Sequence, residues 1–460
     1  MNLHLPGHHA PATADMHTEL PVAGPRRRPH WINLHRVRTY SYTSLIGGSL
    51  FILIYLTRLN LPHAVDMSPM SQDFTAIWSA AWLAVHGHAA TAWDPAVLRA
   101  IEERIVPSMH GSTGALLWLY PPHMLLLVSP LGWLPFVLAA MLWLGTTYAM
   151  FVAVIRGIVQ HNTAALCAVA FPAALVVVIV GQTSLFTAAI GGLGLLLLQR
   201  RPALAGICFA ILTVKPQFAV LFPFALLCSG QWRALVAWTA SVAGIAALAT
   251  LAFGIGTWIS FAHGLDFAYQ AISVPGHAKL DRMPTVYSMV MLAGLPRFVA
   301  QGLQTLSGIA AFAAVGYAWR GSCAYSLRAA TLACASLLVS PYLYDYDLTW
   351  LGLVIAWYAR HALAYGWRRF DREWLTLLWV TPVACLAIVV YIQVQFVPLI
   401  TLGSLALLVA RIAQERRASP CLPDAHDVAN ETEFAHAARP HRAAHLAVRL
   451  DRSLPLGGHR

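Results

Sequence analysis

An acidic residue opens an amphipathic stretch in the first part of the chain. Residues 73–86 carry apolar side chains at helical spacing, and Asp73 stands at their start. A carboxylate there can cap the helix by accepting backbone N–H groups, and the helix N-terminus favours its negative charge. It can also act as a general base, which removes a proton from a hydroxyl group at a membrane surface. The sequence leaves both roles open.

A single cation interrupts a long apolar region. Lys215 is the only charged residue between Pro202 and Arg233, and Pro216 follows it directly. A cation in such surroundings is costly and is a candidate for function, while the proline breaks the helix as expected beside a cavity. Lys215 can therefore bind a phosphate, or it can extend its ammonium group to the membrane interface. Gln217 is expected to face the same cavity.

Other polar residues lie at the ends of apolar runs. Gln182 falls between two runs, where a turn at the membrane surface explains it as well as a binding role does. Tyr120 and His123 flank a double proline that suits the start of a helix. Lys279 and Arg282 belong to a charged cluster, which either is simply solvated or binds a ligand.

Two carboxylates, Asp345 and Asp347, follow Tyr344 in a tyrosine-rich stretch. A metal ion would use such oxygens, but two carboxylates alone are a weak metal signal, and helix capping is an equal alternative. No C-x-x-C pair occurs, so neither a zinc site nor a disulfide framework is predicted. We assign no metal ligand and no cofactor, and a divalent metal is left open.

The composition excludes an ordinary soluble enzyme. Of 460 residues, 58% are hydrophobic and 11% are charged, whereas a soluble domain has about 25% charged residues. The mean hydropathy is +0.62. These values predict an all-α polytopic membrane protein. The net charge of +11 is explained by Arg-rich cytoplasmic loops beside anionic membrane lipid, so nucleic acid is not an expected partner.

The chain divides into a membrane domain and two polar ends. We predict disordered cytoplasmic ends at 1–38 and 414–460, with the membrane domain at 39–413. The apolar runs indicate about 11 to 13 spans, although several fall short of the roughly 20 residues of a full crossing. Residues 60–114 and 254–284 are long enough to form outer loops. In the first of them, 73–86 and 95–106 are predicted to be helices lying on the membrane surface.

The charges indicate the orientation. Arg-rich connections should face the cytoplasm, and nine of the eleven acidic residues between Tyr40 and Ala410 then fall outside or at the outer ends of spans. We therefore expect a multi-pass protein of the cytoplasmic membrane with both termini in the cytoplasm. The nine acidic residues are Asp66, Asp73, Asp94, Glu102, Glu103, Asp266, Asp281, Asp345 and Asp347.

Six motifs, taken in this order, resemble those of the family 87 glycosyltransferases, which are multi-pass enzymes of the GT-C type. The resemblance extends from about Gln72 to Ala356, and each motif alone is weak. The motifs are DFTAIWSAAW at 73–82, LYPP at 119–122, SPLGWLP at 129–135, GQ at 181–182, KPQ at 215–217 and SPYLYDYDL at 340–348.

The resemblance implies a GT-C-like helical bundle, a polyprenyl-phosphate sugar as donor, and Asp73 as the catalytic base. The expected reaction is inverting transfer of a mannose-like hexose or a pentose to a glycolipid or glycan acceptor at the outer membrane face. Cations would stabilise the charge that develops on the phosphate. The donor and acceptor site is expected to contain Tyr120, His123, Gln182, Lys215, Gln217, Lys279, Arg282, Tyr344, Asp345 and Asp347.

Two other classes of membrane protein share part of this pattern. A lipid or sugar transporter or flippase is also apolar with a few buried charges, but it needs no long first outer loop that carries a carboxylate. A polysaccharide polymerase or ligase takes a lipid-linked oligosaccharide and tends to have its large outer loop later in the chain. Here the segment 60–114 is longer than 254–284.

The predicted orientation can be tested by cysteine labelling. Single cysteines placed in 60–114 should react with a membrane-impermeant maleimide on intact cells, because this segment is expected outside. Labelling that appears only after the membrane is ruptured would contradict the orientation.

Overall fold

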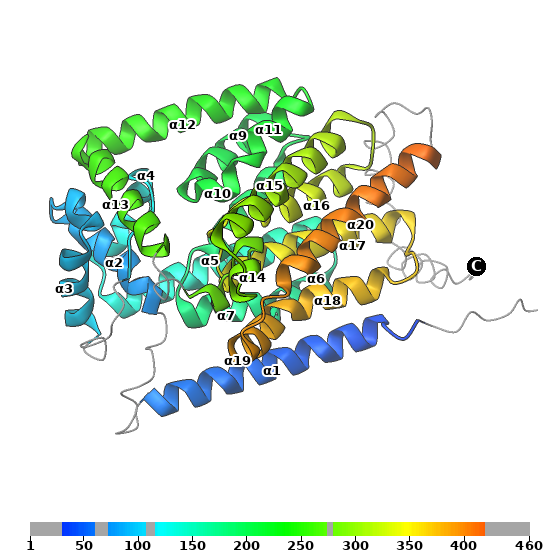
Figure 1. Ribbon diagram of the computed structural model, residues 1–460, viewed down its shortest axis with the longest axis horizontal. Helices are drawn as coiled ribbons and strands as arrows, with labels where there is room; N and C mark the ends of the chain where they lie inside the picture. The colour runs from blue at the N-terminus through cyan, green and yellow to red at the C-terminus, as the bar shows by residue number, and fades with distance from the viewer. Residues whose placement is uncertain (1–29, 60–71, 107–115, 274–278, 419–460) are drawn as a thin grey trace, which may run out of the picture.

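The computed structural model describes residues 30–59, 72–106, 116–273 and 279–418, and these segments are helical with no strand among them (Figure 1). The all-α class predicted from the composition is therefore confirmed. The helices of the first half are α1 (Leu34–Leu59), α2 (Gln72–Val85), η2 (Ala89–Trp93), α3 (Pro95–Ile105), α4 (His123–Val128), η4 (Ser129–Trp133), α5 (Phe136–Val159), α6 (Asn162–Val169), α7 (Pro172–Val180), α8 (Ser184–Leu197), α9 (Pro202–Ile211), η5 (Leu212–Val214), α10 (Pro216–Ala219) and α11 (Leu221–Cys228).

The second half begins with a long helix at the edge of the bundle and ends with α20. Its helices are α12 (Trp232–Phe253), α13 (Gly256–Ser273), η6 (Leu280–Arg282), α14 (Val286–Leu292), α15 (Arg297–Arg320), α16 (Tyr325–Ser336), η7 (Asp345–Trp350), α17 (Leu351–Tyr365), α18 (Asp371–Ala384), η8 (Cys385–Val389), α19 (Val390–Ile392) and α20 (Val397–Ala418).

Five helices in the described part of the chain are long and apolar enough to cross a membrane, or six if the pair α6 and α7, bent by 43°, counts as one span. The other apolar runs of the centre form helices of 10–17 residues. The sequence indicated about 11 to 13 spans because it counts apolar runs, and many of these runs are divided by prolines and glycines into shorter helices. The five helices are α5, α12, α15, the stretch Asp371–Val389, and α20.

The short helices meet in the middle of the bundle. Pro172, Pro202 and Pro216 each stand at the first positions of a helix, where the missing N–H costs no hydrogen bond. Gly181 ends α7 with a φ of 86°, a backbone conformation that glycine adopts without strain. These breaks place polar side chains between helices, at the depth where a cavity can form.

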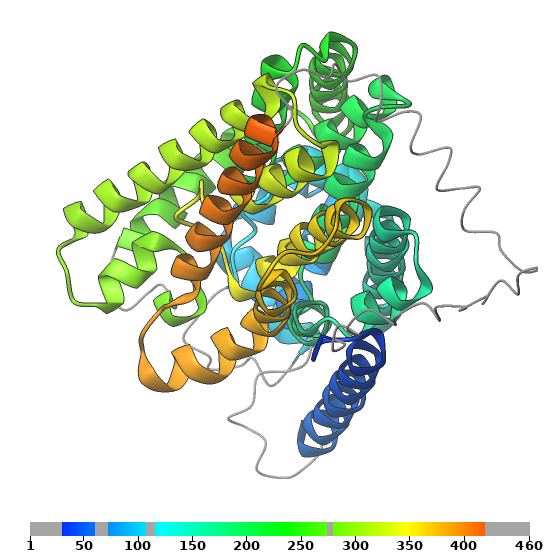
Figure 2. The same ribbon diagram turned by 90° about the vertical axis from the view of Figure 1, so that its right-hand side faces the viewer.

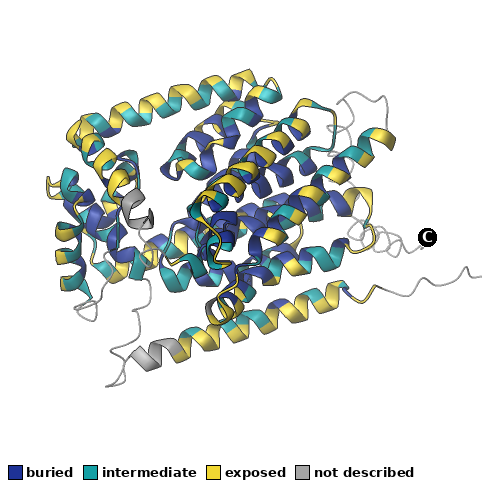
Figure 3. Ribbon diagram, in the orientation of Figure 1, coloured by how far each residue is buried: buried dark blue, intermediate teal, exposed yellow. Residues whose placement is uncertain are grey.

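The inner helices α8, α16 and α17 are buried, whereas α1 and α12 expose most of their side chains (Figure 3). α1 packs on α6 and α7 at the outside of the bundle (Figure 1 and Figure 2). The core centres on η7, where the buried Trp350 ring stacks on Phe218 with centroids 4.7 Å apart. η7 contacts α7, α8, α17 and α18, so it anchors several helices at once.

The helices predicted at 73–86 and 95–106 agree with α2 and α3 to within one residue. Both lie at one end of the molecule, while the first residue of α1 and the last of α20 lie near the other end (Figure 1). Of the predicted disordered ends, residues 1–29 and 419–460 lie outside the described residues. Residues 34–38 and 414–418 are helical, since they belong to α1 and α20.

A glycine fixes the position of α2. A Cβ atom on Gly132, in η4, would lie 2.5 Å from the backbone oxygen of Ala81 and 2.8 Å from the backbone nitrogen of Trp82. α2 and η4 therefore touch backbone to backbone. The indole of Trp78 adds a hydrogen bond of 2.9 Å to the carbonyl of Leu134.

We expect Gly132→Ala to destabilise the docking of α2 by about 1–3 kcal/mol, because no flexible side chain can yield to the added methyl group. Thermal unfolding in detergent measures the loss. Gly145→Ala is the matched control, since a Cβ there meets nothing within 4 Å. Equal melting temperatures for the two variants would contradict this role of Gly132.

Candidate active site

The carboxylate of Asp73 is held by a chain of polar groups from the bundle. Its Oδ2 accepts a hydrogen bond of 2.8 Å from Nε2 of Gln182, in the turn between α7 and α8. The Gln182 carbonyl in turn accepts from the hydroxyl of Tyr120 at 3.0 Å, and that hydroxyl lies 2.9 Å from Oγ1 of Thr183. No backbone N–H of the described residues bonds to Asp73. The cap role that the sequence left open is therefore not what holds this carboxylate.

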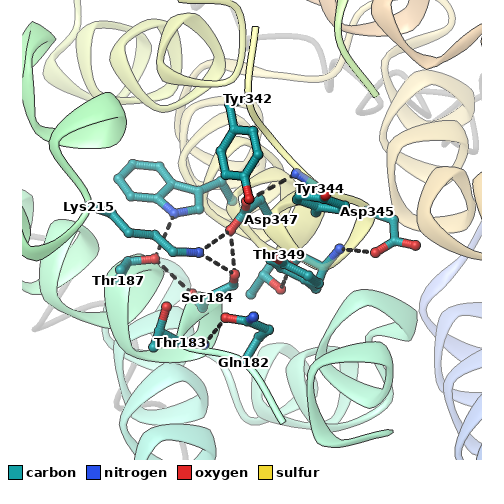
Figure 4. A network of polar contacts seen from close by, with 12 residues as sticks. Gln182, Thr183, Ser184, Thr187, Lys215, Tyr342, Tyr344, Asp345, Asp347 and Thr349 are labelled. Atoms are coloured by element: carbon teal, nitrogen blue, oxygen red, sulfur yellow. Dashed lines mark hydrogen bonds and ion pairs between the residues drawn. The ribbon is translucent and has the colours of Figure 1, made fainter. Parts of the chain in front are cut away.

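A buried ion pair lies on the other side of Gln182. Nζ of Lys215 is 2.8 Å from Oδ1 of Asp347 and 3.4 Å from the hydroxyl of Ser184, which also donates to Asp347 (Figure 4). The second oxygen of Asp347 accepts from the backbone N–H of Tyr344 at 3.2 Å. Lys215 thus does not reach the membrane interface; it contributes a charge to the inside of the bundle.

The two carboxylates of the tyrosine-rich stretch have different partners. Asp345 accepts two hydrogen bonds from the Arg282 guanidinium, at 2.8 and 2.9 Å, whereas Asp347 pairs with Lys215. In the described residues, no three His, Cys, Asp or Glu side chains gather as a metal site would require. The rings of Tyr342, Tyr344 and Tyr346 lie in a row with successive centroids 5.4 Å apart.

Burial sets the electrostatics of the outer-loop carboxyls. Loss of water raises the pKa of Asp73, while the Gln182 hydrogen bond and the positive charges of Arg282 and Lys279 oppose this rise. Burial also raises the pKa of Glu102, on α3, to about 7, and the negative charge of Asp73 adds to the rise. Asp73 therefore has donors and cations that favour its charged form.

A cavity of about 890 Å³ opens beside these groups. One wall is apolar and comes largely from α13 and α15, including Phe261, Leu265, Ile309 and Phe312. The opposite wall is polar and carries residues of both networks. The predicted residues that line this cavity are Tyr120, Gln182, Lys215, Gln217, Tyr344 and Asp347.

The remaining predicted residues lie around the cavity. Asp345 and Arg282 form their ion pair next to it, and Lys279 is exposed but acts on the charge of Asp73. His123 does not line the cavity. Its Nε2 lies 3.1 Å from Oγ1 of Thr213, and its ring is 6.3 Å from that of Trp258.

Several site residues escaped the sequence analysis. Ser184 joins the Lys215 ion pair, and Arg297 and Gln301 of α15 line the cavity. Glu102 was counted only among the outer acidic residues. The available signal for Arg297 was its place after Pro296 at the start of a long helix, where a cation opposes the helix dipole.

The comparisons with known proteins give one family. Residues 118–341 match the model of glycosyltransferase family 87. This match confirms the family that the motifs resemble, and it indicates a glycosyltransferase. It contains Tyr120, Gln182, Lys215 and Arg282, whereas Asp73 lies before it. No curated protein and no solved structure matches the chain.

The buried ion pair gives a prediction for stability. Lys215→Met should cost on the order of 3–5 kcal/mol, because it leaves the Asp347 charge buried without its partner. The double variant Lys215→Met/Asp347→Asn should regain most of this loss, as neither group is then charged. Unfolding in detergent measures both.

The control for this prediction is Arg99→Met, which breaks the partly exposed pair with Glu103. Such a pair is worth about 1 kcal/mol or less. A single Lys215→Met protein as stable as the double variant would show that the ion pair does not carry the charge of Asp347.

Proposed function

We propose that the protein is an inverting glycosyltransferase that moves a sugar from a polyprenyl-phosphate donor to a glycolipid or glycan acceptor. The observation that carries the proposal is the Asp73 carboxylate, which Gln182 holds next to a cavity with one apolar and one cationic side. The family 87 match supports sugar transfer. A mannose-like hexose or a pentose is the sugar that we expect.

The cavity suits a donor with a lipid tail and a phosphate. A prenyl chain would lie along the apolar wall of α13 and α15 and continue into the bilayer. The ammonium group of Lys215 has three donors, and two of them are directed at Asp347 and Ser184, which leaves one for a phosphate oxygen. Lys279 and Arg282 add positive charge on the side of Asp73. These cations would stabilise the charge of the departing phosphate.

Asp73 would act on the acceptor. Its carboxylate takes the proton of an acceptor hydroxyl as that oxygen attacks the anomeric carbon. The bond from the anomeric carbon to the phosphate oxygen breaks, and polyprenyl phosphate leaves with the electron pair. A single displacement of this kind inverts the anomeric centre. The phosphate already carries negative charge, so the leaving group needs no proton.

We further propose that the reaction takes place at the outer face of the cytoplasmic membrane. The arrangement of the helices supports this, because α2 and α3 lie at the end of the molecule opposite the described ends of α1 and α20 (Figure 1). Arg416 and Arg417 lie in the last turn of α20, where cytoplasmic arginines are expected. Both termini would then be cytoplasmic, and the base would lie outside.

Asp73→Asn tests the base. The variant keeps an oxygen that can accept the Gln182 hydrogen bond but loses the proton acceptor, so turnover should fall about 10²–10⁴-fold. Transfer is measured in liposomes with a small panel of polyprenyl-phosphate sugars.

Asp94→Asn is the matched control in the same outer loop. Asp94 caps α3 by accepting from the backbone N–H of Ala96 at 2.9 Å, and asparagine caps nearly as well. Its turnover should stay close to that of the unchanged protein. Normal transfer by a well-inserted Asp73→Asn protein would remove Asp73 from the mechanism.

A further inference from the structure

A second carboxyl group is buried near the proposed base without any hydrogen bond. Glu102 lies on α3 with 0% of its surface exposed, and neither side-chain oxygen has a partner. The next residue differs sharply, because Glu103 is partly exposed and pairs with Arg99 at 2.8 Å. A buried carboxylate without donors is costly, so the neutral, protonated form is the one that this environment favours.

The charges around Glu102 have the same effect. α3 packs on α2 and η2, and η2 carries no titratable side chain. On α2 the titratable group is Asp73, whose negative charge acts on Glu102 more strongly than the positive charge of Arg99 does. Glu103 also opposes ionisation of Glu102, and Asp94 is occupied as the cap of α3. Burial and the neighbouring charges therefore both keep a proton on Glu102 near neutral pH.

Asp73 has the opposite environment. It receives an N–H donor from Gln182 and the attraction of Arg282 and Lys279, all of which stabilise a negative charge. Two carboxyl groups that interact in a buried place do not readily ionise together, and the one with donors takes the charge. The negative charge thus belongs on Asp73 and the proton on Glu102.

We propose that Glu102 and Asp73 form a carboxyl pair that holds one proton near neutral pH, with Glu102 as a positioning residue that sets the proton affinity of the base. This inference rests on the proposed role of Asp73. It assigns no contact between Glu102 and a substrate. Glu102 acts through its charge on Asp73, across the packed interface of α2 and α3.

The pair predicts a specific pH dependence. Below neutral pH, Glu102 is protonated and leaves the proton affinity of Asp73 unchanged. As the pH rises through about 7, Glu102 loses its proton, and the new negative charge increases the proton affinity of Asp73. A base with higher proton affinity removes a proton more readily. The turnover number should therefore rise through neutral pH in addition to any rise caused by ionisation of Asp73 itself.

Glu102→Gln tests this pair, because glutamine has the shape of a protonated glutamate and cannot ionise. We measure kcat and KM for transfer from a polyprenyl-phosphate sugar in liposomes between about pH 5.5 and 8.5. At the acid end the variant should lie within about twofold of the unchanged protein. Through neutral pH the unchanged protein should gain several-fold in kcat, whereas the variant stays level. KM for the donor should not change.

Two further variants separate this effect from a structural one. Glu103→Gln changes the adjacent carboxyl and should keep the neutral step in kcat. Glu102→Asp restores an ionisable group and should restore a step. If Glu102→Gln inserts poorly, Glu102→Met provides a second neutral side chain of similar length, and it too should lack the step.

The outcomes distinguish this inference from the proposed function. A neutral step that persists in both neutral variants at Glu102 would overturn the carboxyl pair, even if Asp73→Asn is inactive. Full activity of Asp73→Asn would instead overturn the proposed base and with it the pair. A requirement for Mn²⁺ that disappears on replacing either carboxyl would replace the proton with a shared metal ion and also overturn the inference.

Discussion

The ion pair between Lys215 and Asp347 is the interaction on which the centre of the molecule depends. Each partner stands at a break in a helix, one between η5 and α10 and the other inside η7, and Ser184 joins them from the start of α8. Neither charge is tolerable alone at this depth, so each makes the other necessary. The pair thereby fixes the relative positions of three interrupted helices. It also leaves a cationic surface on the wall of the cavity.

The outer-loop helices depend on this centre in a different way. α2 and α3 are not spans, and α2 is held by its backbone contact with η4 at Gly132 and by one side-chain bond from Gln182 to Asp73. The core therefore supplies a rigid floor of broken helices, while the loop supplies the carboxyls. Such a division suits an enzyme that must admit a lipid from the bilayer and an acceptor from the aqueous side.

Local features were readable from the sequence, and long-range pairings were not. The periodicity of 73–86 and 95–106 predicted α2 and α3 to within a residue, because an acid and a proline mark their starts. Lys215 was identified by its isolation, but its partner lies 132 residues away, and no local pattern encodes that distance. Glu102 and its neighbour Glu103 are indistinguishable as letters. Only the packing of α3 on α2 decides which of the two is buried.

The ion pair has a practical consequence for chemical labelling. The whole chain has two lysines, Lys215 and Lys279. The first is buried and hydrogen-bonded, whereas the second is exposed and three residues before Arg282. Amine-reactive dyes or cross-linkers applied to the folded protein will therefore attach at Lys279 and at the chain's amino terminus. One fluorophore can thus be placed at the cationic edge of the site without any mutation, as a reporter of what approaches it.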